Sequence, residues 1–428
     1  MKKLLVVQVA ALGAEFLSHH RQKLELANIK FKPIQTVFPA VTSTVQASFR
    51  TGKLPNEHGM VGNGFFSREL RKPMFWEQSS NLINGDRIWD RFRENGGTVG
   101  MVFWQQSLGT RADVILSPAP IHKHHGGIIQ DLYSRPAELH WHLTSKIGRS
   151  FNLADYWGPK ASIKSSEWIV EATRQVMESP SPDLLLTYLP HLDYELQRSG
   201  PQSNQSAQTL EELNSLLKRL LSHAKSCDYQ FVIFGDYAMH EVRRPIFPNR
   251  ILLQEGYLRT RRVKAMLYPD FHTSSAFAVV DHQIAHVITS DEETKEEVEK
   301  LFGIQEGISD VLRDTEKREY RIDHPRTGDL VLVSEPDSWF AYPWWEQSEA
   351  APEYASHVDI HNKPGYDPCE LFWGLWPISV CSDASRICGS HGLAGPDNRV
   401  VYGSSFDLPP EGHLTDLSNY ISEELLGD

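Results

Sequence analysis

Residues 37–44 read VFPAVTST, and they are followed by TGKLPNEHG at residues 51–59 and GNG at residues 62–64. A short apolar run therefore leads into a cluster of hydroxyl side chains, with Gly and Asn just downstream. A hydroxyl held in this way can attack a phosphorus centre, and nearby donors can stabilise the charge that develops. The stretch therefore predicts a nucleophile loop. Its alternative is an ordinary Thr/Ser-rich turn between a strand and a helix.

Three further blocks follow in order, and they read LPHLDYELQRSGP at residues 189–201, FVIFGDYAM at 231–239 and GSHG at 389–392. Together with residues 37–64, they resemble the alkaline phosphatase superfamily. The resemblance is to its type I phosphodiesterase and nucleotide pyrophosphatase branch, with phosphonoacetate hydrolase as a near relative. It covers nearly the whole chain. It implies an α/β fold, a three-layer α/β/α sandwich with a largely parallel central sheet and an inserted α+β cap.

The resemblance also implies a ligand set for two divalent metal ions that lie side by side. Asp193, Asp236 and His391 stand at ligand positions and retain the expected residue type. Three other ligand positions are changed, because an Asp, a His and a second His of the family pattern are replaced by Ala10, Gln197 and Tyr237. An amide oxygen is a poor zinc ligand, since zinc prefers imidazole, thiolate or carboxylate. The chain is therefore expected to be a divergent member with altered metal ligands.

Other donors near these blocks are candidates to replace the lost ligands. The first are Asp359 and His361, whose spacing of two residues puts both side chains on one face of an extended segment. His191 and His240 are further candidates. We expect a divalent metal as cofactor, zinc being the family's choice, with one or two ions bound. The alternative is that no metal binds.

The predicted function is metal-assisted hydrolysis of a phosphodiester or related phosphoester of a small metabolite. The resemblance implies that Thr42 attacks phosphorus and that Asn63 donates to the phosphoryl oxygens, while Gln197 and Tyr237 are candidate substrate contacts. One alternative is a non-hydrolytic enzyme, a transferase or lyase, that acts on a phosphorylated metabolite. Another is a non-catalytic protein that binds a phosphorylated ligand with a degraded metal site.

Composition agrees with a large globular protein, since 40% of the 428 residues are hydrophobic and 23% are charged. The chain alternates between apolar runs, at residues 4–10, 98–103, 184–188 and 231–234, and helical patterns, at 165–177 and 207–225. This alternation favours a parallel sheet with helices on both faces. Between residues 245 and 345 the strands become shorter. We therefore expect a catalytic core at 1–244 and 346–428, with a cap insertion at 245–345.

The net charge of −12 and the absence of a basic stripe argue against a nucleic-acid partner. No stretch has the roughly 18 to 20 apolar residues that a membrane span requires. The amino-terminal apolar run is short, carries Gln8 and occupies the place of the first central strand, so it is interpreted as a strand rather than a signal peptide. With only four cysteines in the chain, we expect a cytoplasmic protein that takes a small phosphorylated substrate. The sequence leaves its oligomeric state open.

Overall fold

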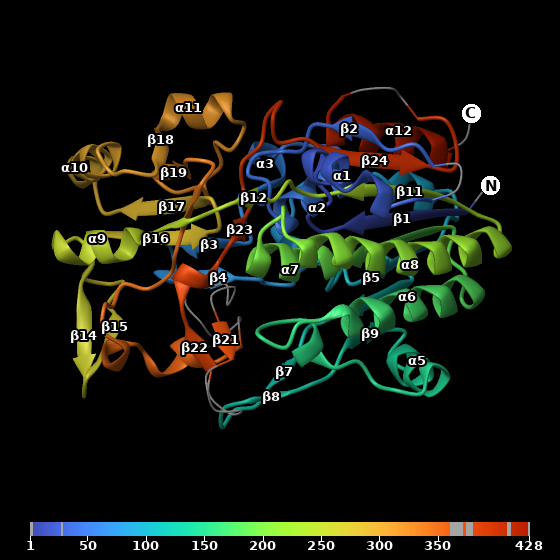
Figure 1. Ribbon diagram of the computed structural model, residues 1–428, viewed down its shortest axis with the longest axis horizontal. Coiled ribbons are helices and arrows are strands. Elements are labelled where there is room, and N and C mark those ends of the chain that lie inside the picture. Colours follow the sequence, from blue (N-terminus) through green and yellow to red (C-terminus); the bar gives the residue numbers. More distant parts are fainter. Residues whose placement is uncertain (1–2, 27–28, 360–370, 374–379, 409–411, 427–428) are drawn as a thin grey trace.

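The computed structural model describes residues 3–26, 29–359, 371–373, 380–408 and 412–426, and a central sheet organises this part of the chain. Its strand order is β2-β24-β11-β1-β10-β5-β6-β9 (Figure 1). The five strands from β11 to β6 are parallel to one another, whereas β24 and β9 pair antiparallel with their neighbours. The bounds are β1 Lys3–Val9, β2 Lys32–Ile34, β5 Val99–Val102, β6 Val114–Ser117, β9 Tyr133–Arg135, β10 Leu184–Leu189, β11 Tyr229–Gly235 and β24 Val400–Ser404. The largely parallel central sheet predicted from the sequence is confirmed.

Helices cover both faces of this sheet, which explains why its central strands are apolar almost throughout. Successive residues of a strand point to opposite faces, and two residues of β10 show what each face meets. The Thr187 hydroxyl lies 2.9 Å from the hydroxyl of Thr173 on helix α6, and the Tyr188 hydroxyl lies 3.5 Å from that of Thr42 on helix α2. Helices α6 and α2 therefore lie on opposite faces, and the predicted three-layer α/β/α arrangement is confirmed.

The longest helix, α8, shows how these layers are held to the sheet. Its buried leucines, among them Leu210, Leu213 and Leu217, recur at helical spacing, and Ser203 caps its amino-terminal end by accepting from the Ser206 N–H. The helix bounds are α1 Ala14–His19, α2 Thr42–Thr51, α3 Pro55–His58, α4 Asp90–Glu94, α5 Leu139–Ile147, α6 Ile163–Glu178, α7 His191–Ser199, α8 Asn204–Ser226, α9 Pro248–Gln254, α10 Glu292–Gly303, α11 Asp314–Glu319 and α12 Leu414–Leu426.

A second, antiparallel sheet lies at the other end of the molecule, in the order β16-β17-β19-β18 (Figure 1). Its strands are β16 Ala276–Asp281, β17 Ile284–Thr289, β18 Ile308–Leu312 and β19 Leu330–Ser334. All four belong to the region expected to form the cap. Its hydrophobic cluster also includes Phe66, Phe75 and Trp76, so the β3–β4 hairpin packs with the cap. The hydrophobic cluster of this second sheet thus includes residues outside 245–345.

Short strand pairs complete the described structure. They are β3 Gly64–Ser67 with β4 Lys72–Phe75, β7 Ile121–His122 with β8 Ile128–Ile129, β12 His240–Glu241 with β23 Gly389–Ser390, β13 Arg244–Ile246 with β20 Ser338–Phe340, β14 Thr260–Val263 with β15 Met266–Pro269, and β21 Leu371–Trp373 with β22 Val380–Ser382. The β12–β23 pair has the largest consequence for the site, because it brings the segment that carries His391 next to the segment after β11.

The carboxyl ends of β1, β10 and β11 meet at one edge of the central sheet, where open α/β sheets bind their ligands. At this edge the loop after β1 packs tightly on the end of β11. A Cβ atom on Gly235 would come within 2.2 Å of the Leu12 carbonyl oxygen, so only glycine allows this approach. The loop is thereby held beside Asp236, the residue that follows.

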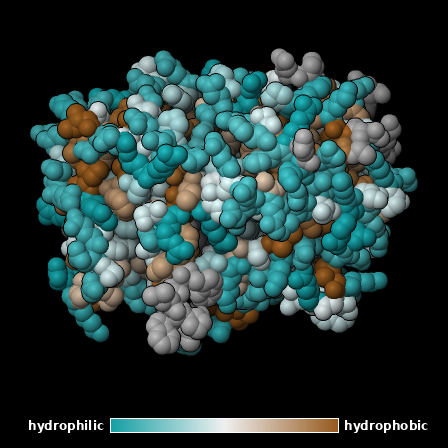
Figure 2. Space-filling view, in the orientation of Figure 1, coloured by the Kyte–Doolittle hydropathy of each residue, from teal (hydrophilic) through white to brown (hydrophobic). Residues whose placement is uncertain are grey.

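Hydrophilic residues predominate on the face of the molecule that Figure 2 shows, and hydrophobic residues form only small groups there. Within the described part of the chain, no helix combines the length and the apolar character needed to cross a membrane.

Candidate active site

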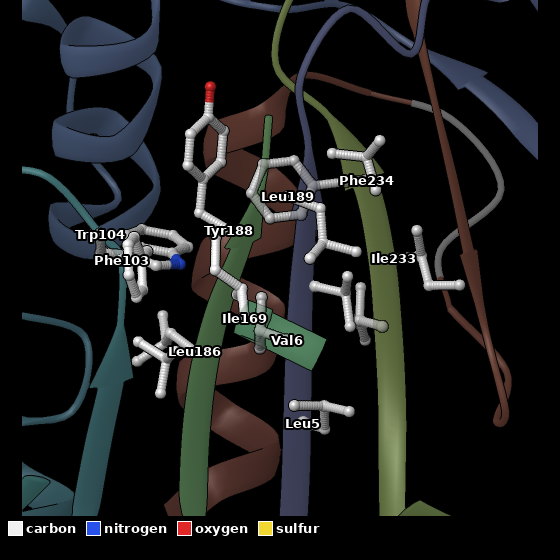
Figure 3. Close-up of a cluster of buried hydrophobic side chains, with 14 of the residues drawn as sticks. Leu5, Val6, Phe103, Trp104, Ile169, Leu186, Tyr188, Leu189, Ile233 and Phe234 are labelled. Atoms are coloured by element: carbon white, nitrogen blue, oxygen red, sulfur yellow. The ribbon is translucent and has the colours of Figure 1, made fainter. Parts of the chain in front are cut away.

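Thr42 is the first residue of α2 and is almost fully buried, with 4% of its surface exposed. Its hydroxyl lies 3.5 Å from the Tyr188 hydroxyl, which projects beyond the apolar cluster at the end of β10 (Figure 3). Because Thr42 occupies the first turn of the helix, its backbone N–H has no intrahelical acceptor, and it donates to no other group within the described residues. The site therefore presents both a hydroxyl and an N–H group at the amino-terminal end of α2.

Asn63 lies beside Thr42 and is held from two directions. Its Oδ1 accepts from the backbone N–H of Ser43 at 3.0 Å, and its Nδ2 donates to Oδ1 of Asp281 at 3.0 Å. The backbone N–H of Asn63 donates to the other oxygen of Asp281 at 2.7 Å. Since a carboxamide nitrogen carries two hydrogens, one remains for a ligand in the pocket that Asn63 lines. The Asn63 donor predicted from the sequence is thus fixed by a carboxylate of the cap.

Asp193 lies in the first turn of α7, where two side chains donate to it. Nε2 of Gln197, one helical turn later, lies 2.8 Å from each carboxylate oxygen, and the Tyr237 hydroxyl donates to Oδ1 at 2.9 Å. Gln197 and Tyr237, the predicted substrate contacts, do line the pocket. The phenol hydrogen of Tyr237 is used on Asp193, however, and is not free for a phosphoryl group.

Asp236 directly follows β11 and is completely buried. Its Oδ1 accepts from the backbone N–H groups of Ala11 and Tyr237, at 3.0 and 2.9 Å, and its Oδ2 accepts from Nε2 of Gln8 at 3.0 Å. Burial raises the pKa of Asp236 to about 8, against the three hydrogen bonds, which favour the charged form. Desolvation is therefore the dominant influence on this carboxyl group.

His391 is packed between two rings. The Tyr237 ring is parallel to it, with centroids 3.5 Å apart, and the His282 ring lies on it with centroids 4.0 Å apart. Nδ1 lies 2.9 Å from the Ala40 carbonyl oxygen, to which it donates, so Nε2 carries the lone pair and lies 4.0 Å from Oδ1 of Asp193. Burial, and next the nearby His282, hold the pKa of His391 well below its usual range, which leaves the imidazole neutral.

One pocket brings these groups together. Thr42, Asn63, Asp193 and His391 all line it, whereas Asp236 lies buried beneath, bonded through its Oδ1 to the backbone of Tyr237. The remaining lining residues are mainly aromatic or hydrogen-bonding, and they are Trp76, Gln105, Tyr156, Trp157, Gly158, Tyr188, Pro190, Tyr194, Gln197, Arg198, Tyr237, His282 and Leu371.

Arg198 adds a positive charge to the lining of the pocket. Its guanidinium donates to the Gly158 and Ala161 carbonyl oxygens at 3.1 and 3.2 Å, which fixes its place beside the pocket. Sequence reasoning missed this residue, although it directly follows Gln197 in a quoted block. It also missed the roles of Asp281 and His282, because both belong to the cap and reach the site only through the turn between β16 and β17.

The candidate substitute ligands that the structure describes do not line this pocket. Asp359 lies 3.1 Å from His122 and lines a neighbouring, mostly apolar pocket that shares Trp157 with the site. Nε2 of His191 lies 2.9 Å from Glu212, and His240 lies between Gln283 and Asn398. The last candidate, His361, lies outside the described residues.

The donor set at this site does not fit a pair of zinc ions. Ala10 offers only a methyl group, Gln197 turns an N–H donor toward Asp193, and the phenol of Tyr237 likewise donates to that carboxylate. In the described ranges of the chain, no group of three or more His, Cys, Asp or Glu side chains is arranged to hold a metal ion.

Comparisons with known proteins agree with this architecture. The family model described as type I phosphodiesterase/nucleotide pyrophosphatase matches residues 5–367. Human ectonucleotide pyrophosphatase/phosphodiesterase 5 is similar in structure, with a TM-score of 0.61 and 15% identity over 99% of this chain and 95% of that one. Phosphonoacetate hydrolase from Sinorhizobium meliloti 1021, in complex with phosphonoacetate, gives a TM-score of 0.62 and 15% identity over 98% and 95% of the two chains. No curated protein is matched by sequence. The structural matches, at such low identity, show the alkaline-phosphatase-like fold.

Proposed function

Because the chain belongs to the type I phosphodiesterase/nucleotide pyrophosphatase family of phosphoric ester hydrolases, we propose that its pocket binds the phosphoryl group of a small phosphorylated molecule through hydrogen-bond donors of its own. The observation that carries this proposal is the amino-terminal end of α2. There Thr42, whose N–H has no acceptor among the residues that the structure describes, lines the same pocket as Asn63. Helix amino-termini bind phosphates because their N–H groups and the helix dipole both favour negative charge.

The charges around the pocket support recognition of an anion without a metal. Arg198 supplies a guanidinium, and the Asp193 carboxylate is already satisfied by Gln197 and Tyr237. A phosphoryl group would therefore meet donors at Thr42 and Asn63 and a compensating charge at Arg198. Hydrogen bonds to a charged acceptor are the stronger kind, which suits a small pocket with few donors.

Turnover through Thr42 is the second candidate, favoured by the position of its hydroxyl in the pocket. In that reaction Oγ1 would bond to phosphorus as the ester P–O bond breaks, the departing alkoxide would gain the proton, and water would later hydrolyse the phosphothreonine. A threonine needs activation by a base or a metal. The Thr42 hydroxyl lies beside the Tyr188 hydroxyl, and burial raises the pKa of this phenol well above its usual range, which makes it a poor base at neutral pH. The geometry therefore supports binding better than fast hydrolysis.

Two substitutions at Thr42 separate the contributions to binding. Thr42→Val removes the hydroxyl and keeps the N–H, whereas Thr42→Pro removes both. Proline is tolerated at the first position of a helix, and Val41 already has the extended backbone that precedes a proline. By calorimetric titration of chelator-treated protein with bis(para-nitrophenyl) phosphate, we expect Thr42→Val to weaken binding about 10-fold and Thr42→Pro considerably more.

Asn204→Pro is the matched control, since Asn204 is the exposed first residue of α8 and lies outside the pocket lining. It should bind like the unsubstituted protein. Equal binding by all of these variants would contradict the proposal. Release of para-nitrophenol, measured in parallel, tests whether the protein also hydrolyses the ester. Turnover that disappears in Thr42→Val would favour hydrolysis through this residue.

A further inference from the structure

Members of this family are typically metal-dependent, yet both carboxylates retained at ligand positions are occupied by donors of the protein itself. Asp193 receives hydrogen bonds from Gln197 and Tyr237, and Asp236 receives them from Gln8 and from the backbone of Ala11 and Tyr237. We infer that these hydrogen bonds replace the two metal ions, so that the site is fully assembled without any metal. This inference goes beyond the proposed phosphoryl binding and does not depend on it.

The residues that replace the family's histidine ligands are the same residues that donate to Asp193. Gln197 and Tyr237 stand where the family pattern has two histidine ligands, and both now donate to Asp193. An imidazole ligand offers a lone pair to a metal, whereas an amide nitrogen and a phenol offer hydrogens to a carboxylate. Each replacement therefore removes one metal ligand and adds a hydrogen-bond donor to Asp193, the ligand that remains.

The loop after β1 provides donors for the other carboxylate, Asp236. Ala10 lacks the carboxylate expected there, and the next residue, Ala11, turns its N–H to Asp236 at 3.0 Å. Gln8, two residues before Ala10, adds its amide nitrogen to the other oxygen of the same carboxylate. Asp236 is completely buried, so without these donors it would be an unsatisfied polar group. Gln8 and the loop that follows β1 therefore supply the partners that a metal ion would otherwise provide for Asp236.

The packing of His391 also opposes metal binding. The parallel Tyr237 ring covers one face of the imidazole at 3.5 Å, and this places the Tyr237 hydroxyl on Asp193. A metal ion joining Nε2 of His391 to Asp193 would have to displace that hydroxyl and the Gln197 amide. Removing partners from a buried carboxylate is costly, so weak metal binding cannot compete with the internal network.

Zinc binding tests the inference directly, by calorimetric titration and by elemental analysis of the full-length protein after dialysis against zinc. We expect no stoichiometric uptake by the unsubstituted chain. We expect uptake by the triple variant Ala10→Asp, Gln197→His, Tyr237→His, which restores the family's ligand types. Stoichiometric zinc in the unsubstituted protein that is lost in Asp193→Ala with His391→Ala would overturn the inference, and so would a folded triple variant that takes up none.

Tyr237→Phe provides a second readout if the triple variant fails to fold. It keeps the ring stacked on His391 and removes only the hydroxyl on Asp193. We expect its melting temperature to fall by about 2 to 3 °C, equally with chelator and with zinc. Tyr257→Phe is the control for loss of a tyrosine hydroxyl, since Tyr257 bonds to Glu297 in the cap. A Tyr237→Phe variant no less stable than this control would contradict the replacement of metal by hydrogen bonds.

Discussion

At the scale of single residues, the pair formed by Asn63 and Asp281 determines how the pocket can receive an anion. Asp281 accepts from both the backbone nitrogen and the side-chain nitrogen of Asn63, at 2.7 and 3.0 Å. These two bonds fix the plane of the amide, so that its second hydrogen has a defined direction. Asp281 is therefore a positioning residue in the proposed function, and it acts through Asn63.

Asp281→Asn should weaken binding of bis(para-nitrophenyl) phosphate about 10-fold, because an amide nitrogen at this position would face the donating nitrogen of Asn63. Calorimetric titration measures the change. The swapped pair, Asn63→Asp with Asp281→Asn, separates positioning from stability. It restores a donor opposite an acceptor, so the melting temperature should recover, but it places a carboxylate beside the ligand, so binding should not. Recovery of both properties would show that Asp281 has only a structural role.

The sequence predicted that Thr42, Asp193 and His391 would meet at the site, but it missed the contributions of other residues there, and it did not show how the site residues bond to one another. Thr42, Asp193 and Asp236 lie near the ends of strands or at the start of helices, and these positions follow from apolar periodicity and the quoted blocks. The orientation of the Gln197 amide and the stacking of Tyr237 on His391 depend on tertiary contacts. Both residues were expected to contact substrate; they line the pocket and also donate to Asp193, a contact that the sequence did not predict.

At the scale of elements, α2 is held by buried polar contacts more than by its own helix propensity. All ten of its residues are buried, and several are Ser or Thr, which are weak helix formers. The Arg50 guanidinium donates to the Gln46, Gln105 and Gln106 carbonyl oxygens. The Ser48 hydroxyl lies 2.8 Å from Nε2 of His58 on α3. These contacts fix the helix whose amino-terminal end forms the proposed phosphoryl site.

The contact with His58 predicts an acid-sensitive anchor of α2. Burial, with Arg50 as the next contribution, lowers the pKa of His58 from 6.5 to about 3. The unfolded chain therefore binds a proton that the folded chain does not, so this contribution to stability is complete above pH 6.5 and is lost as the pH falls toward 3. At about pH 5 the loss should be roughly 2 kcal/mol of the free energy of unfolding.

Urea unfolding at about pH 7.5 and about pH 5 measures this loss, with His58→Gln as the comparison. The variant should be less stable at the higher pH, because it disturbs the contacts with Ser48 and Met60, but its stability should decline less between the two pH values. His286, whose pKa burial lowers to about 4, is unchanged in both proteins and gives both the same further decline. An identical decline with and without His58 would contradict the prediction.

The elements themselves were predictable where a pattern is long and periodic. The helical pattern at residues 165–177 corresponds to α6, Ile163–Glu178, and the apolar run at 231–234 to β11, Tyr229–Gly235. Short edge elements such as β2, Lys32–Ile34, were not predicted, because three residues give no period. The strand β2 forms by pairing with β24, which is distant in the sequence.

At the scale of the whole molecule, the site is formed jointly by the central sheet and the cap. The turn between β16 and β17 reaches over the sheet edge, where Asp281 bonds to Asn63, His282 packs on His391 and the Gln283 N–H donates to the His391 carbonyl oxygen at 2.8 Å. The family resemblance predicted a cap but not these contacts, since they join segments far apart in the chain. The segment that carries β16 and β17 therefore takes part in forming the site.

This arrangement predicts that chelators leave the folded protein unchanged. Both carboxylates keep their protein donors when no metal is present, so the melting temperature should be the same after dialysis against a chelator as after dialysis against zinc. Differential scanning calorimetry measures it. A metal that bound only the folded state would instead raise the melting temperature in proportion to its concentration and affinity. Such a rise, if it vanished in Asp193→Ala, would show that the site requires an ion.

The most direct test of phosphoryl recognition without metal is calorimetric titration of the chelator-treated protein with bis(para-nitrophenyl) phosphate, repeated after zinc is added. The donors at Thr42, Asn63 and Arg198 predict saturable binding with the same dissociation constant in both conditions, and weaker binding by Thr42→Pro. Binding that occurs only after zinc is added, and that is lost in Asp193→Ala, would contradict it and would return the site to metal-assisted chemistry.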